Sequence, residues 1–216
     1  MNRNVRPLRL LAAVVVVTAA AGCAKMFTET PRPLYTLTAP PAPANANLPH
    51  TNAQIVIVAP YAPEGLDLRR ISVVRAANGL DYLADGEWAD RGSAMVRAVL
   101  VEAFENSKAV AAVGPDTFDL RADFEIEGDL RHFEAVYDSP GGTPSAIPTV
   151  WVALAVKLVK IPERKILAQT VISAREPAAA NATPQIVAAF NAATGKVAQQ
   201  VVAWTLTNPA LSRPHR

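Results

Sequence analysis

The longest strand of the predicted sheet reads ADFEIEGDLRHFEAVY, from Ala122 to Tyr137. In its first half the apolar side chains, such as Phe124 and Ile126, alternate with acidic ones. This alternation is typical of an antiparallel strand with one buried face and one solvated face. Phe133 falls on the wrong parity, which predicts a β-bulge near His132.

The segments around this strand predict an α+β domain. Two apolar stripes have helical spacing; one helix begins with Asp90 or Ser93 as its N-cap, and the other with Thr183 as N-cap and Pro184 in the first turn. We expect a mostly antiparallel sheet with both helices packed on one face. The other predicted strands cover residues 34–37, 54–58, 71–75, 80–84 (after the Asn78-Gly79 turn), 109–113, 149–161 and 166–174.

The N-terminus reads as an export signal. Three arginines precede an apolar run, residues 10–21, which is too short to cross a bilayer, since a spanning helix needs about 20 residues. Small residues, Ala20 to Gly22, then precede Cys23, and this arrangement resembles the lipobox of bacterial lipoproteins. The resemblance implies cleavage after residue 22 and acylation of Cys23. The alternative is ordinary cleavage that leaves a free thiol.

Cysteine usage supports the lipoprotein interpretation. Cys23 is the single cysteine of the 216 residues, which excludes an internal disulfide and a zinc site built on several cysteines. An Asp directly after the lipidated cysteine would resemble an inner-membrane retention signal, but this chain has Ala24 at that position. We therefore expect the periplasmic face of the outer membrane, with the inner membrane as the less favoured location.

Proline content divides the mature chain. Residues 24–50 contain six of the eighteen prolines, and such a segment favours polyproline II and acts as a semi-rigid spacer. We expect residues 23–50 to form a tether in which residues 34–37 dock as an edge strand. One α+β domain follows at residues 51–207, with a tail at 208–216.

The charge balance argues against a nucleic-acid partner. The full chain has 21 basic and 19 acidic residues, but the signal peptide contains three of the arginines and no acid. The mature chain therefore has 18 basic and 19 acidic residues, so the small positive charge belongs to the export signal.

A search for chemistry finds no catalytic motif, so we expect no enzyme activity, no metal and no cofactor. The chain lacks a G-x-S-x-G elbow, an H-E-x-x-H pair and a phosphate-binding loop. His50, His132 and His215 are scattered, and we expect a structural role for His132. The acidic row of residues 123–129 offers a cation site as one interpretation, but strand alternation explains it fully as a solvated face.

Two aromatic residues stand out before the first helix. Tyr82 and Trp88 lie on either side of an acidic turn. They are candidates for contact with a partner or a lipid, and the alternative is that Trp88 covers the core. A loop at residues 138–148 also has two interpretations: a plain connection between strands, or a mobile loop that contacts a partner.

Several of these segments together resemble the ABC-type transport auxiliary lipoprotein component family, which includes the lipoprotein of the paraquat-inducible transport system. The likeness spans roughly residues 23–206. The matching segments are Pro33–Leu37, Ile55–Val58, Gly65–Asp67, Arg70–Ile71, Tyr82–Ala84, Trp88–Asp90, Ala122–Phe124 with Phe133, and Ala189–Phe190.

The resemblance implies a non-enzymatic periplasmic lipoprotein that works with an MCE-type lipid transporter. Its partners would be the MCE-domain protein, the permease and the ATPase, besides the membrane that holds the acyl chains of Cys23. The family also implies assembly of several copies into a ring. The rival hypothesis is a lipoprotein activator or scaffold of a cell-wall synthase, and missing nucleophile motifs argue against an envelope hydrolase.

The lipid anchor is testable by replacing Cys23 with serine. Because a serine oxygen is not a substrate for thioether lipidation, C23S should move from the membrane fraction to the soluble periplasmic fraction and lose the mass of its acyl chains. Fractionation and mass spectrometry of the intact protein measure both changes. Equal membrane partition of the two proteins would contradict the prediction.

Overall fold

The computed structural model describes residues 31–41, 48–76, 79–117, 121–137 and 146–211. The chain divides into residues 1–32 and 33–216, and the fold described below is that of the second unit. The predicted signal peptide and Cys23 fall outside the described residues, and so does most of the loop at 138–148.

The alternating strand is β6 (Phe124–Val136), and it is the strand that joins the parts of the sheet. Along one edge it pairs antiparallel with β7 (Thr149–Lys160) over its whole length. Its other edge is shared by two strands that both run parallel to it: β2 (Gln54–Ile57) beside its first half and β3 (Arg70–Ala76) beside its end.

Four further strands extend the sheet outward. β4 (Gly79–Trp88) forms the predicted hairpin with β3, and β8 (Lys165–Pro177) forms a second hairpin with β7. β1 (Leu34–Tyr35) pairs parallel with β4, and β5 (Ala112–Pro115) pairs parallel with β2. Among the described residues, eight strands form one mixed sheet whose long ladders are antiparallel, and the predicted α+β class is confirmed.

The predicted bulge is present in β6. Leu130 lies opposite Leu154 and His132 lies opposite Ala153, so Arg131 is the extra residue on the β6 side. The shift restores the parity of the strand, because Phe133 now points to the same face as Leu130 and is 1% exposed. It also turns two consecutive side chains, Arg131 and His132, toward the opposite face.

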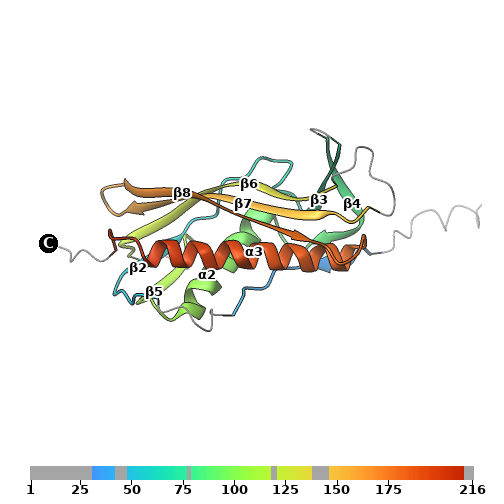
Figure 1. Ribbon diagram of the computed structural model, residues 1–216. Coiled ribbons are helices and arrows are strands. Elements are labelled where there is room, and N and C mark those ends of the chain that lie inside the picture. Colours follow the sequence, from blue (N-terminus) through green and yellow to red (C-terminus); the bar gives the residue numbers. More distant parts are fainter. Residues whose placement is uncertain (1–30, 42–47, 77–78, 118–120, 138–145, 212–216) are drawn as a thin grey trace, which may run out of the picture. The chain divides into compact units, whose positions relative to one another are not determined.

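Two helices cover one face of the sheet. α3 (Thr183–Leu206) runs along β7 and β8, and α2 (Gly92–Ser107) packs beside it, as Figure 1 shows. Three rings join the layers: Trp88 from β4 lies 5.7 Å from Phe133 and 5.2 Å from Phe190, measured between ring centroids. Such pairs add about 0.5–1.5 kcal/mol each to the burial of apolar area.

Both helix starts differ from the sequence prediction. The N-cap of α2 is Arg91, without a side-chain cap bond from its own residue, and the Asp67 carboxylate accepts the amide of Ser93 at 3.1 Å. The N-cap of α3 is Ala182, while the Thr183 hydroxyl donates to Asp85 at 2.6 Å. The predicted local caps are wrong: at α2 the distant Asp67 accepts an amide of the first turn, and at α3 the Thr183 hydroxyl donates to Asp85 instead of capping the helix.

The predicted strand at 109–113 is also displaced, since β5 spans Ala112–Pro115. Gly114 and Pro115 belong to the strand instead of ending it. β5 is an edge strand that pairs with β2 alone, and a proline is tolerated on an edge because its missing amide removes no ladder bond on the open side.

Residues 33–41, here called the strap, are fixed on the helical layer beyond the predicted edge strand. The amide of Thr38 donates to Asn191 of α3 at 2.9 Å, and the Pro40 carbonyl accepts from Asn106 of α2 at 3.1 Å. Pro40 lies directly above Gly195, where an added Cβ would meet the proline ring at 3.4 Å. A glycine in mid-helix costs about 1 kcal/mol relative to alanine, and here it lets the strap lie close to α3.

Enlarging Gly195 should therefore release the strap. A leucine here would occupy the space of Pro40, so G195L should expose Tyr35 and Leu37 to chymotrypsin and speed cleavage in the strap at least fivefold. Limited proteolysis followed by mass spectrometry measures the rate.

G195A is the matched control, because a single methyl meets Pro40 only at the limit of contact and improves the helix. Its cleavage rate should equal that of the wild type. Equal rates for G195L and G195A would show that the strap does not depend on this contact.

Candidate functional site

The predicted site residues fall in three different places. Cys23 is not among the described residues, so its lipidation stays a prediction. Trp88 is 1% exposed and lies in the aromatic cluster of the core, which agrees with the core alternative for this residue. Tyr82 is half-buried; its hydroxyl donates to the Gly65 carbonyl at 3.3 Å, and the Arg70 guanidinium lies 4.0 Å above its ring.

Within β6 the acidic row is paired with bases, whereas Asp123, just before the strand, accepts the amide of Gln54 at 2.8 Å. Arg164, from the β7–β8 turn, bridges Glu125 and Glu127, the latter at 2.7 Å. Lys157 lies 3.9 Å from Asp129. The row is therefore a solvated strand face whose charges are balanced by neighbours on the sheet, as strand alternation predicts.

The side of β6, β7 and β8 that faces away from the helices is here called the outer face. Alternate residues of β7 (Val150, Val152 and Leu154) point to the helices and are at most 1% exposed. The residues between them point outward, and two of these are the small Ala153 and Ala155. Because the centre of the outer face has only the methyl groups of these two alanines, the longer side chains around it project further from the sheet. The two alanines thus form the floor of a shallow depression, here called the Ala153–Ala155 floor.

A four-residue cluster forms one end of the outer face. The ring of Trp151 stacks on His132 of β6, with centroids 3.3 Å apart and planes 10° from parallel. The guanidinium of Arg175 on β8 lies 3.9 Å from the Trp151 ring centroid. Since β7 lies between β6 and β8, the imidazole and the guanidinium cover opposite faces of the indole.

Glu134 holds this cluster in place from below. Its side chain is 7% exposed, and one carboxylate oxygen lies 2.6 Å from His132 Nδ1. The other oxygen accepts the amide of Phe133 at 2.6 Å. A buried carboxylate with two partners fixes the imidazole, and the imidazole in turn fixes the orientation of Trp151.

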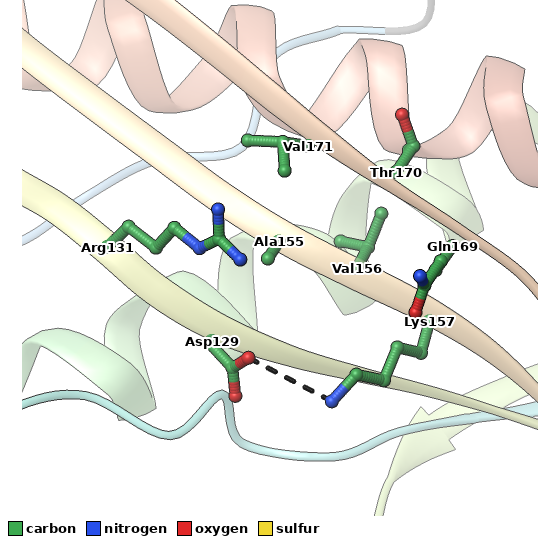
Figure 2. Close-up of a pocket in the computed structure, with 8 residues that line it drawn as sticks. All are labelled: Asp129, Arg131, Ala155, Val156, Lys157, Gln169, Thr170 and Val171. Carbon is green, nitrogen blue, oxygen red and sulfur yellow. Dashed lines mark ion pairs between the residues drawn. The ribbon is translucent and has the colours of Figure 1, made fainter.

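A groove of about 210 Å³ lies beside the cluster (Figure 2). Arg131, the bulge residue, extends its guanidinium toward Ala155, and the Asp129–Lys157 ion pair lies along the lower side of the groove in this view. This volume is below the roughly 300–1,000 Å³ of ordinary small-molecule pockets. The lining residues are Asp129, Arg131, Ala155, Val156, Lys157, Gln169, Thr170 and Val171.

Sequence reasoning missed Trp151 and Arg175. The position of Trp151 could have been predicted from strand alternation. It alternates with the buried apolar residues of β7 and lies on the same side of the strand as Lys157. An aromatic residue on the solvated parity of a strand is a candidate contact residue. The partners of Trp151 come from separate strands, so their convergence required the pairing register.

The described residues contain no cluster of three or more His, Cys, Asp or Glu side chains placed to hold a metal ion. In the same part of the chain, neither helix combines the length and apolarity that a membrane span requires.

These features define a class of protein: an α+β domain with one helix-covered sheet face, one solvated face and an N-terminal strap fixed on its helices. The chain belongs to the ABC-type transport auxiliary lipoprotein component family, whose pattern matches residues 35–202. It is thus a member of a family of membrane-anchored bacterial lipoproteins associated with ABC transporters.

Solved structures share this fold. Protein XCC0632 from Xanthomonas campestris is 28% identical, with a TM-score of 0.72 over 80% of this chain and 94% of its own. A second crystal structure, 11% identical, has a TM-score of 0.60 over 81% of this chain and 98% of its own, and shows the fold alone.

A curated relative extends the comparison to sequence. A Bradyrhizobium diazoefficiens protein, bll6063, is 29% identical over 161 residues, which are 72% of this chain. The chain spans only 40% of the length of this relative.

Removing the carboxylate of Glu134 tests its anchoring role. E134A leaves the Phe133 amide without its acceptor and His132 without its anchor, so the protein should lose about 1–3 kcal/mol of unfolding free energy. Urea denaturation of the lipid-free C23S protein measures the loss.

E125A is the control, because it removes an ion pair at the margin of the sheet and should cost below about 1 kcal/mol. Equal losses for the two variants would contradict the anchoring role of Glu134.

Proposed function

We propose that the protein is a non-enzymatic accessory subunit of an MCE/ABC-type transporter of phospholipid or another hydrophobic molecule, anchored through Cys23 to the periplasmic face of the outer membrane. The observation that carries the proposal is the family match over residues 35–202, which covers nearly the whole described domain. Ala24 after Cys23 supports the outer membrane as the location.

The domain would bind the transporter close to the membrane, because the segment between Cys23 and the strap is short. The strap fixes the chain on the domain from Pro33 onward, through the bond of the Pro33 carbonyl to Glu87 and the contacts of Thr38 and Pro40 with the helices. Ten residue steps lead from Cys23 to Pro33, with nine residues between the two. At about 3.1 Å per residue in polyproline II they reach roughly 30 Å, so a transporter would have to approach the membrane to be engaged.

A binding role without catalysis is supported by the chemistry of the outer face. Its acidic row is paired with Arg164 and Lys157, and its buried acid, Glu134, is held by an imidazole and a backbone amide. Its groove is smaller in volume than an ordinary substrate pocket. These features suit contact with a macromolecule better than turnover of a small one.

Recovery of the protein from native membranes tests the proposal. A C-terminally tagged chain, solubilised in mild detergent, should retain an MCE-domain protein together with a permease and an ATPase. C23S is the control, because it keeps the domain but loses the anchor, and its yield of these partners from membranes should fall at least fivefold.

Recovery of no transporter subunit would contradict the proposal. Recovery of a penicillin-binding protein in their place would favour the alternative, a scaffold or activator of a cell-wall synthase.

A further inference from the structure

We infer that the outer face of β6–β8 is a docking surface for an acidic segment of a partner protein, whose carboxylates pair with Arg131 and Arg175 on either side of the Ala153–Ala155 floor. The inference deepens the proposed function by naming the surface that meets a partner. It rests on that function only for the identity of the partner, not for the chemistry.

The first argument is that the outer face has two arginines without an acidic partner among the described residues. Each acid of β6 on this face has a basic side chain beside it: Arg164 pairs with Glu125 and Glu127, Lys157 pairs with Asp129, and His132 contacts Glu134. Arg131 and Arg175 are both exposed, and neither forms an ion pair with any described residue. The face therefore presents two guanidinium groups that an external carboxylate would complement, each with the fork geometry that favours carboxylates.

The second argument is that the aromatic cluster holds Trp151 in a fixed orientation. Trp151 is half-buried, stacked on His132 and covered by Arg175, and His132 is held by the buried Glu134. A tryptophan fixed in this way loses little conformational entropy on binding, and Trp and Arg are the residues most enriched among the energetic hot spots of protein interfaces. The anchor of the surface is thus ordered before a partner arrives.

The dimensions of the face favour a protein segment over a lipid. The groove of about 210 Å³ is smaller than an ordinary small-molecule pocket, and the polar side chains in its walls (Asp129, Lys157 and Gln169) do not suit an acyl chain. The exposed Val171, at 53%, supplies an apolar edge for a neighbouring side chain of the segment. Figure 2 shows Val171 and Arg131 on adjoining sides of Ala155.

Strand geometry gives the spacing of the carboxylates. Arg131 lies level with Ala153 and Leu154 of β7, whereas Arg175 lies opposite Trp151. With strands about 4.8 Å apart and about 3.3 Å of rise per residue, their backbone positions are roughly 12 Å apart. An extended partner segment would therefore present two acids about three or four residues apart.

Photo-crosslinking in living cells tests the inference on the full lipidated chain. Benzoylphenylalanine in place of Val171 should crosslink to a partner peptide that contains at least two Asp or Glu residues, mapped by mass spectrometry. Charge reversal in R131E or R175E should lower the crosslinking yield at least tenfold, since like charges then oppose each other. Lysines in place of the mapped acids should restore the yield with R131E.

K165E is the matched control, because Lys165 is an exposed base at the other end of the same strand. Its crosslinking yield should equal that of the protein whose only change is benzoylphenylalanine in place of Val171. Unchanged chymotryptic cleavage of all variants shows that the domain stays folded.

Four results would overturn the inference: a crosslink to lipid, a crosslink to another copy of this chain, no crosslink at all, or equal yields from R131E and K165E. These results are distinct from failure of the proposed function. If the tagged chain still retains the transporter, only the docking surface is wrong. If an acidic segment of a protein unrelated to transport is crosslinked, the docking surface stands and the proposed function fails.

Discussion

One extra residue in β6 governs both faces of this domain. β6 pairs with β2, β3 and β7, so its thirteen residues must keep one apolar face toward the helices while three partner strands define the register. A strand with strict alternation would place Phe133 in solvent. The bulge at Arg131 corrects the parity and keeps Phe133 packed against Trp88 and Phe190.

The same bulge divides the outer face into two electrostatic halves. Before it, the acids of β6 alternate regularly and meet bases from β7 and the β7–β8 turn. After it, His132 stacks on Trp151 and the bulge residue itself extends over the alanine floor without an ion-pair partner among the described residues. A single insertion thus stabilises the core on one side and creates an uncompensated basic region on the other.

The strap connects this architecture to the membrane anchor. Its hydrogen bonds to Asn191 and Asn106 and its contact above Gly195 hold residues 33–41 on the helical face, opposite the outer face. Ordering these residues costs backbone entropy, and the burial of Leu37 together with the hydrogen bonds to the two asparagines helps to offset that cost. The strap therefore occupies the helical side of the domain, and the outer face of the sheet stays uncovered by it.

Features that depend on neighbours in the chain could be predicted from the amino-acid sequence alone. Alternation defined β6 and its bulge, Asn78-Gly79 located the β3–β4 hairpin, and helical spacing located α2 and α3. The family resemblance and the expected lipid anchor also came from short local motifs. Local periodicity is enough for these features because side chains one to four residues apart share a face or a turn.

Features that depend on pairing between distant segments could not be predicted in this way and are seen only in the folded domain. Asp67 replaces the predicted cap of α2, and β5 begins later than its apolar run because its bounds follow the register with β2. Trp151, Arg175 and Glu134 come together from three strands, so no window of sequence contains the cluster. Their meeting is a consequence of strand register, which is set by the burial of the whole apolar face rather than by the residues of the cluster.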